Sequence, residues 1–417
     1  MKSPQDDVPT WLTLAVTLII AVAFGIFTYR RGRIESPDTA TYSAWADVLI
    51  SSDFSYIKTV RSLSFVVPTY LYLGWITVVA LFKITLGPAW PKGIVTLNYC
   101  LTVLAIWGAL DLVKRTTVRS SCVVVAGLLL LIAYDLLHWV GFVLSDVSFT
   151  ALSFGVFYLL CVTSTATERT SFLTVKHVVC VALVILALFY RPTGAPLVLV
   201  GGITYLTSRL IKSKCDVKRA SMALRIALGL FLIGIGTVVV HAYLMKNPSS
   251  WPVSFSSAWI GRLSEEYHQG YVVFQRPETY VPNPTSLLDY IFITLKKLAY
   301  FFSYAAHSFS FTHKLANLVF FLPAYALSLL AAINLFRKNS LLSLKEWWVA
   351  WLAVLWICSF ALFHSMQQID FDWRYRLPCT LQLVVLSAIG FKILISNRSG
   401  FIALLKNQSR PYSNPAA

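Results

Sequence analysis

The sequence places two carboxylates beside long apolar runs, where they could act on protons. Asp38 follows the first apolar run in the segment Glu-Ser-Pro-Asp-Thr-Ala-Thr-Tyr, and Asp146 stands at a short turn between two later runs. A carboxylate beside apolar helices is partly desolvated, which suits it to accept a proton from a hydroxyl or an amine. Asp is also a preferred N-cap residue, so either side chain could instead begin the helix that follows. Asp38 and Asp146 are therefore candidate general bases, with helix capping as the alternative role.

A third polar segment, Asp370 to Pro378, stands before the last long apolar run and contains Arg374, Tyr375 and Arg376. A guanidinium presents a fork of donors that matches phosphate oxygens, and Lys does not. A Tyr can add a hydroxyl hydrogen bond while its ring packs on lipid. This segment therefore predicts a phosphate clamp at the headgroup level, although an aromatic and basic belt at the membrane interface would contain the same residue types.

The composition indicates that a membrane positions these residues. Of the 417 residues, 57% are hydrophobic and 13% are charged, and the mean hydropathy is +0.68. Soluble domains carry about 25% charged residues. Apolar runs of about 20 residues, enough to cross a bilayer as a helix, recur along the chain, whereas the alternating segments of a β-barrel do not. We therefore expect an all-α polytopic membrane protein.

The charge and the cysteines exclude two other classes of site. The net charge of +17 does not indicate nucleic acid, because Lys and Arg lie mainly in short loops between apolar runs, where they orient helices and meet anionic headgroups. The seven cysteines include no Cys-x-x-Cys pair and no cluster with the spacing of metal ligands. The sequence therefore predicts neither a disulfide framework nor a zinc site.

About ten runs are expected to cross the membrane within one membrane domain, residues 1–417. They are 11–29, 94–113, 121–140, 147–163, 176–190, 194–210, 224–244, 314–336, 346–364 and 377–395. A further apolar stretch, 63–86, is ambiguous because it contains Pro68 and ends in a Gly-Pro pair. If it crossed, Lys114 and Arg115 would face outward against the positive-inside rule. We therefore expect 63–86 to be an interfacial or re-entrant element.

This orientation determines which loops lie on the extracytoplasmic side of the membrane and which on the cytoplasmic side. Residues 30–93 form the first extracytoplasmic loop, 245–313 form a long one with amphipathic helices on the outer surface, and 396–417 form a cytoplasmic tail. Arg191, at another outer turn, and Arg61, at the start of the ambiguous stretch, add cations to this face. One face thus gathers carboxylates, several Arg and surface helices, as a phosphate-lipid substrate requires.

Three arginines disagree with the orientation. Arg30, Arg31 and Arg33 follow the first span and would lie outside. They could extend to lipid headgroups as ordinary interfacial side chains, or they could bind an anionic lipid. Both interpretations stay open.

The chain resembles the GT-C superfamily of membrane glycosyltransferases, in the branch of protein O-mannosyltransferases and bacterial aminoarabinose transferases. The features that carry the resemblance are Pro-Asp-Thr-Ala-Thr-Tyr ending at Tyr42, the Ser-Asp turn at Asp146, Tyr-Arg-Pro at Arg191, and Asp-Trp-Arg-Tyr-Arg-Leu-Pro from Asp372 to Pro378. The last is the most specific. In this order, the four features are spread across nearly the whole chain.

The resemblance implies a polyprenyl-phosphate sugar donor used on the extracytoplasmic side of a bacterial inner membrane. It implies inverting transfer to a lipid, glycan or protein acceptor, with Asp38 as the base and Asp146 as a second acidic residue. Donor binding would fall to Arg374 and Tyr375, with Arg376, Arg191, Arg61 and Tyr42 as further candidates. Because phosphate is already a good leaving group, we expect no obligatory cofactor and no metal at the site, although some relatives in that family bind divalent cations.

The sequence departs from that family in two places. Many members have two adjacent acidic residues in the first loop, whereas Ser36 and Pro37 separate Glu35 from Asp38 here. Many also carry a large soluble domain after the last span, and this chain ends about twenty residues past it. Two other functions stay open: a transporter or flippase of a lipid-linked sugar, and a noncatalytic membrane component of an envelope polysaccharide system.

Overall fold

The computed structural model describes residues 8–63, 69–164, 175–212, 287–307, 309–337, 340–366 and 372–408. These residues form α-helices joined by short 3-10 helices, and they contain no β-strand, only one isolated bridge between Ile34 and Phe142. The predicted span 224–244 and most of the predicted outer loop 245–313 lie outside the described residues. The predicted tail begins inside a helix, because the last helix continues to Gln408.

The N-terminal half contains the helices α1 (Thr10–Arg31), α2 (Pro37–Ser51), α3 (Tyr56–Leu63), η1 (Thr69–Tyr72), α4 (Leu73–Leu86), η2 (Gly87–Ala89), α5 (Trp90–Thr117), α6 (Ser120–Leu131), α7 (Tyr134–Val140), α8 (Ser145–Ser164), α9 (Val175–Tyr190), η3 (Pro192–Gly194) and α10 (Ala195–Lys212). The C-terminal part contains α13 (Leu287–Phe301), α14 (Phe311–Phe336), α15 (Leu344–Met366), η4 (Trp373–Arg376) and α16 (Leu377–Gln408).

The all-α polytopic membrane class is confirmed, but the count of ten spans is not. Within the described residues, six helical segments are long and apolar enough to cross a membrane, and α6 with α7, bent by 54°, would make a seventh. The predicted spans 176–190 and 194–210 correspond to α9 and α10, whose apolar parts are shorter. A protein with these segments can still cross the bilayer many times, because tilt and local thinning accommodate short helices.

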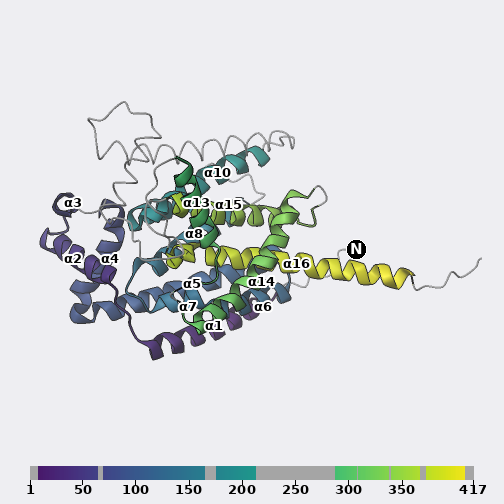
Figure 1. Cartoon of the computed structure of the whole chain (residues 1–417), viewed down its shortest axis with the longest axis horizontal. Coiled ribbons are helices and arrows are strands. Elements are labelled where there is room, and N and C mark those ends of the chain that lie inside the picture. Colours follow the sequence, from purple (N-terminus) through teal and green to yellow (C-terminus); the bar gives the residue numbers. More distant parts are fainter. Residues whose placement is uncertain are drawn as a thin grey trace, which may run out of the picture.

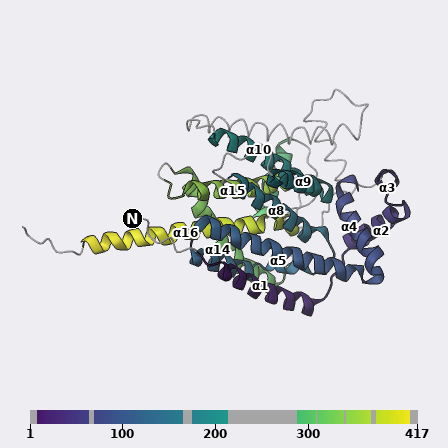
Figure 2. The same ribbon diagram turned by 180° about the vertical axis from the view of Figure 1, so that it is seen from behind.

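The long helices lie side by side, with α2, α3 and α4 gathered at one end and the start of α1 and the far end of α16 at the other (Figures 1 and 2). We call the first the Asp38 end. Helix α16 packs against α14, α15, α5, α6 and α8. Helix α1, in contrast, lies at the periphery of the bundle. It exposes Leu14, Leu18, Val22 and Ile26 along its length, as a lipid-facing helix does.

Small residues bring α14 and α16 into close contact. A Cβ on Gly390 would lie 1.9 Å from the carbonyl oxygen of Leu327, so no side chain fits there. The Ser387 hydroxyl donates to the carbonyl of Ala324 at 2.9 Å and lies 3.0 Å from the Ser328 hydroxyl. Small residues and interhelical hydroxyl bonds are typical of helix packing in membranes, where no hydrophobic effect draws helices together.

Helix α4 occupies most of the ambiguous stretch and lies at the Asp38 end. The segment Leu73–Thr117 has 45 residues, roughly 68 Å of helix at the usual rise, more than twice the hydrocarbon thickness. It is interrupted at Gly87, whose φ is 51°, and α4 packs against both α2 and α5. Lys83 of α4 bonds to Asp47 of α2 at 2.6 Å.

Candidate functional site

Asp38 stands in the first turn of α2 and is not its N-cap. Ser36 is the N-cap: its hydroxyl accepts from the backbone N–H of Thr39, and the Thr39 side chain accepts from the backbone N–H of Ser36. Pro37 occupies the first turn, where its missing N–H costs nothing. Since Ser36 performs the capping, the carboxylate of Asp38 is directed to other partners.

The start of α2 is tied to the loop that precedes Asp146. Thr39 donates its hydroxyl proton to the carbonyl of Val143 at 3.1 Å. Ile34 accepts from the N–H of Val143 at 3.0 Å and donates to the carbonyl of Gly141 at 2.9 Å. These bonds hold two segments more than a hundred residues apart in sequence side by side.

Arg374 contacts Asp38 directly. Arg374 lies in η4, where Asp372 caps the turn by accepting from its backbone N–H at 3.1 Å. Its Nη1 lies 2.6 Å from Oδ2 of Asp38, and its Nε lies 3.4 Å from Oδ2 of Asp372. The Asp38 side chain is 42% exposed, whereas those of Arg374 and Asp372 are each 19% exposed. The structure thus brings together two residues 336 positions apart, as the sidedness of the sequence required.

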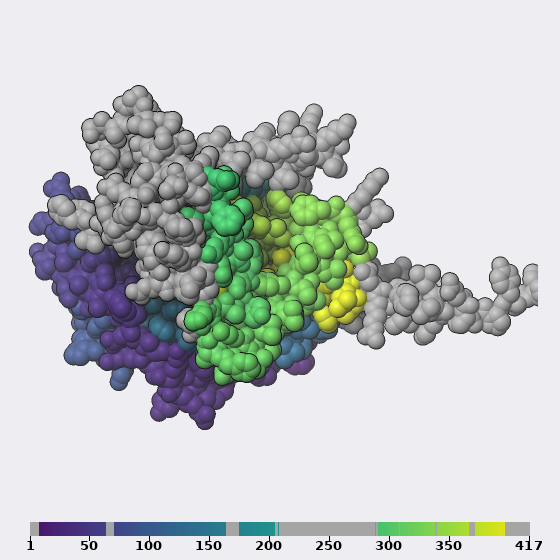
Figure 3. Space-filling model, viewed as in Figure 1, coloured from purple at the N-terminus to yellow at the C-terminus, as the bar shows by residue number. Residues whose placement is uncertain are grey.

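The space-filling view shows how such distant segments meet. The N-terminal helices, in purple and blue, and the C-terminal helices, in green and yellow, adjoin along one face of the molecule (Figure 3). The ion pair between Asp38 of α2 and Arg374 of η4 likewise joins an N-terminal helix to the C-terminal part of the chain.

Asp146 and Arg191 form a second ion pair, which is buried. Nη1 of Arg191 lies 2.5 Å from Oδ1 of Asp146, and the two side chains are 6% and 4% exposed. The same guanidinium donates to the Ser145 hydroxyl at 3.2 Å. Oδ2 of Asp146 and Nε of Arg191 have no hydrogen-bond partner in the described structure. A buried pair of this kind persists because each charge compensates the other, not because the pair is a strong source of stability.

Tyr42, which is buried, and Tyr72, which is partly buried, lie near this pair. Burial raises the pKa of the Tyr42 hydroxyl, and the Tyr72 side chain adds to that rise. Burial also raises the pKa of Tyr72. Burial alone would lower the pKa of Arg191, but the Asp146 carboxylate, together with Tyr42 and Tyr72, offsets it and the pKa is raised. Both tyrosines therefore stay protonated and Arg191 stays charged near neutral pH.

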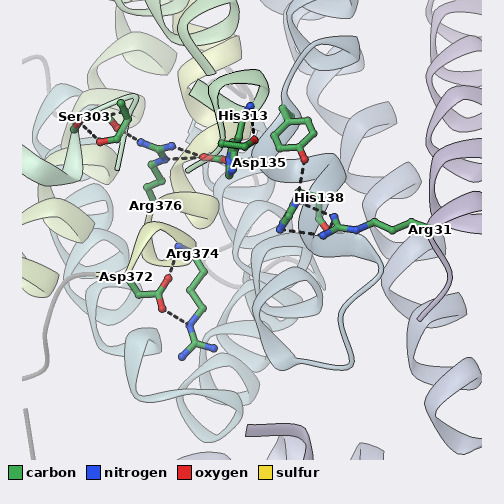
Figure 4. A network of polar contacts seen from close by, with 11 residues as sticks. Arg31, Asp135, His138, Ser303, His313, Asp372, Arg374 and Arg376 are labelled. Carbon is green, nitrogen blue, oxygen red and sulfur yellow. Dashed lines mark hydrogen bonds and ion pairs between the residues drawn. The ribbon is translucent and has the colours of Figure 1, made fainter. Parts of the chain in front are cut away.

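The predicted clamp of adjacent arginines is split. Arg374 and Arg376 point in different directions from η4, and Arg376 extends toward Asp135 and Ser303 (Figure 4). Arg376 is paired with Asp135, donates to the carbonyl of Ser303, and lies over the ring of Phe321 at 4.1 Å. Its side chain is 3% exposed. The structure does not place Arg376 with Arg374 against a common ligand.

Tyr375 lies beside Arg374, whose guanidinium is 5.8 Å from the centroid of its ring, whereas Arg61 belongs to another helix. The ring of Tyr375 stacks on His364 of α15, with centroids 4.5 Å apart and planes within 3° of parallel. Arg61 lies in the last turn of α3 with an exposed side chain, and α3 packs on α2 and η1. Neither of the two ion pairs described above includes Arg61.

A polar cluster around α7 was not predicted as a site. His313 lies 3.1 Å from Asp135, and Arg31 lies 2.7 Å from Nδ1 of His138. The sequence signal was the presence of Asp135 and His138 within an apolar run, since ionisable residues at such depth are costly. Within the described residues, no group of three or more His, Cys, Asp or Glu has the arrangement of a metal site.

Comparison with known proteins gives one structural similarity. No family model matches the chain, and no curated protein sequence matches it. The chain is similar to the crystal structure of ArnT from Cupriavidus metallidurans bound to undecaprenyl phosphate, with a TM-score of 0.46 and 14% identity. The alignment covers 91% of this chain and 59% of that protein, so this chain spans about three fifths of the length of that protein. At this identity, the function of the chain has to be inferred from its own residues.

Proposed function

We propose that the chain is an inverting glycosyltransferase. It transfers a sugar from a polyprenyl-phosphate donor to a hydroxyl or phosphate group of an envelope lipid, glycan or protein, on the extracytoplasmic side of a bacterial plasma membrane. The observation that carries the proposal is the contact between Asp38 and Arg374, at 2.6 Å. An accessible carboxylate and a mostly buried guanidinium there form one site at the end of a membrane-embedded bundle.

The exposed fractions of the Asp38 and Arg374 side chains indicate which of the two acts as the base and which binds the donor phosphate. Asp38 is the more accessible of the two, so it can reach an acceptor that arrives from outside the bundle. Asp372 contacts both the backbone N–H and the Nε of Arg374, and these contacts restrict the orientation of the guanidinium. A lipid phosphate would compete with Asp38 for the Nη1 edge of Arg374, because both are anions that suit the same fork. Donor binding would thereby release the Asp38 carboxylate for the acceptor.

The reaction then needs one displacement. The acceptor oxygen attacks the anomeric carbon on the face opposite the phosphate, its proton passes to Asp38, and the bond from the anomeric carbon to the phosphate oxygen breaks. The electron pair of that bond goes to the lipid phosphate, where Arg374 stabilises the developing charge. Configuration at the anomeric carbon is inverted, because attack and departure occur on opposite faces.

Asp146 acts in this scheme as a positioning residue. Its buried carboxylate holds Arg191 and is too enclosed to meet an acceptor. Arg191 in turn supplies a second fixed positive charge near Tyr42 and Tyr72. Asp146 thus serves the donor site through Arg191.

Two further observations support the proposed side of the membrane. Lys114 and Arg115 stand in the last turn of α5, which begins near α4 at the Asp38 end and runs toward the other. The positive-inside rule assigns these cations to the cytoplasm. The Asp38 end then faces outward.

The test compares two Asp→Asn variants of the full chain in nanodiscs. Radiolabelled polyprenyl-phosphate glucose and polyprenyl-phosphate mannose are supplied with crude envelope acceptor, and release of polyprenyl phosphate is measured. Asp38→Asn should reduce transfer by about 10²–10⁴-fold while donor binding is kept, because the base alone is lost. Asp47→Asn, on the same helix but paired with Lys83, should keep transfer within about twofold. Unchanged transfer in Asp38→Asn would refute the assignment.

A further inference from the structure

The outer tip of α1 presents a cation without an anionic partner. Arg31 is the last residue of α1 and its side chain is partly buried. Its guanidinium lies 5.9 Å from the ring centroid of Phe27 and 5.5 Å from that of Phe142. In the described part of the chain it forms no ion pair, whereas Arg33, two residues on, is paired with Glu35 at 3.1 Å.

The partner of Arg31 is a histidine, and the geometry makes that histidine neutral. Nη1 of Arg31 lies 2.7 Å from Nδ1 of His138. A guanidinium can only donate, so Nδ1 of His138 must accept and carries no proton. The positive charge of Arg31 is therefore not compensated by His138. The nearby Asp135 does not compensate it either, because Asp135 is engaged by Arg376 and His313.

The same tautomer leaves two donors facing each other. With Nδ1 as the acceptor, the proton of the neutral ring of His138 is on Nε2. Nε2 of His138 and Nη2 of Arg31 are 3.4 Å apart, and both carry hydrogens. Neither can accept from the other, so each needs an acceptor, and one atom between them can accept from both. An anionic oxygen is such an atom, and it would also neutralise Arg31.

The surroundings indicate where that oxygen comes from. The side chain before the two arginines at the tip of α1, Tyr29, is 89% exposed, and α1 exposes apolar residues toward lipid along its length. An Arg and a Tyr at the tip of a lipid-facing helix lie at the headgroup level. We propose that Arg31 and His138 form a binding site for the phosphate headgroup of an anionic membrane lipid, separate from the Asp38 site.

The test measures binding of soluble short-chain lipids to the purified full chain in a nonionic detergent by calorimetry. Dihexanoylphosphatidic acid should bind wild type, and dihexanoylphosphatidylcholine should bind at least about tenfold more weakly. Arg31→Gln should weaken binding of the phosphatidic acid by about tenfold or more, because charged hydrogen bonds are lost. The matched control Arg33→Gln should change it by less than about twofold.

The other outcomes decide against the proposal. If Arg31→Gln and Arg33→Gln weakened binding of the phosphatidic acid equally, the lipid would be attracted by the general surface charge and not by a site at Arg31. If both lipids bound wild type equally, the binding would be an unspecific effect of the lipid chains. Inorganic phosphate that bound as tightly as phosphatidic acid would assign the site to free phosphate in place of a lipid. Arg31→Lys, which keeps the charge, covers the case in which Arg31→Gln does not fold. If Arg31→Lys bound the phosphatidic acid as tightly as wild type, the proposed role of the Arg31 guanidinium would be refuted.

Discussion

The buried pair of Asp146 and Arg191 makes a quantitative prediction. Asp146→Asn removes the negative charge, keeps the side-chain size, and leaves the Arg191 guanidinium charged and 6% exposed. Breaking a buried pair by removing one partner costs about 3–5 kcal/mol, because the remaining charge is uncompensated. An exposed pair costs about 0–1 kcal/mol. The exposures of 4% and 6% place this pair in the first class.

The double variant isolates the charge effect. In the background of Arg191→Met, the buried Asp146 carboxylate is already uncompensated, so Asp146→Asn should cost about 0 kcal/mol or stabilise the fold. The coupling energy between the two positions is then about 3–5 kcal/mol. The matched control is Glu35→Gln, whose partner Arg33 is 45% exposed, and the expected loss there is at most about 1 kcal/mol.

The assay is the free energy of unfolding of the full chain, from SDS titration in mixed micelles followed by far-UV circular dichroism. A loss below about 1 kcal/mol for Asp146→Asn would refute the reasoning, since it would mean that water reaches Arg191. Activity separates the roles. If Asp146 only positions Arg191, the double variant should keep kcat within about tenfold and raise the donor KM; a fall in kcat as large as that of Asp38→Asn would make Asp146 a base.

The remaining predictions concern η4 and the helix core. Arg374→Lys should raise the donor KM by about tenfold or more with a smaller effect on kcat, because a point charge replaces a fork; steady-state kinetics with varied donor checks this, and loss of thermal stability with normal kinetics would contradict it. Gly390→Ala should lower the melting temperature, because its Cβ would lie 1.9 Å from the carbonyl oxygen of Leu327 and force α14 from α16; an unchanged melting temperature would contradict the close contact.

The sequence was sufficient for the part of the site that depends on sidedness. Asp38 and Arg374 each stand beside an apolar run, and counting spans from the charges of the loops assigned them to one side. That placement on one side is what the contact requires, and the contact itself appears only in the folded chain. The capping alternative for Asp38 was also decidable locally, because Ser-Pro-Asp-Thr places a better N-cap two residues earlier, with Pro at the next position.

The direction of each side chain in the third polar segment was not predictable in the same way. Residues 374 and 376 look like neighbours in the sequence, but they lie on a 3-10 turn of about three residues, so their side chains point about 120° apart. The partner of Arg376, Asp135, lies in α7, which is bent by 54° from α6. That bend and that turn are results of tertiary packing, and apolar periodicity does not encode them.

The two arginines of η4 therefore divide two tasks that the sequence assigned to both. Arg376 is enclosed, paired with Asp135 and covered by the ring of Phe321, so its position is fixed before any substrate arrives. Arg374 leaves the same turn on another side and meets Asp38, the more exposed member of the pair. Because η4 is anchored through Arg376, the position of Arg374 is also restricted. A phosphate that displaces Asp38 therefore binds a guanidinium that loses little further conformational entropy. Fixing η4 through Arg376 is thus what makes Arg374 a site for a phosphate and not merely an exposed cation.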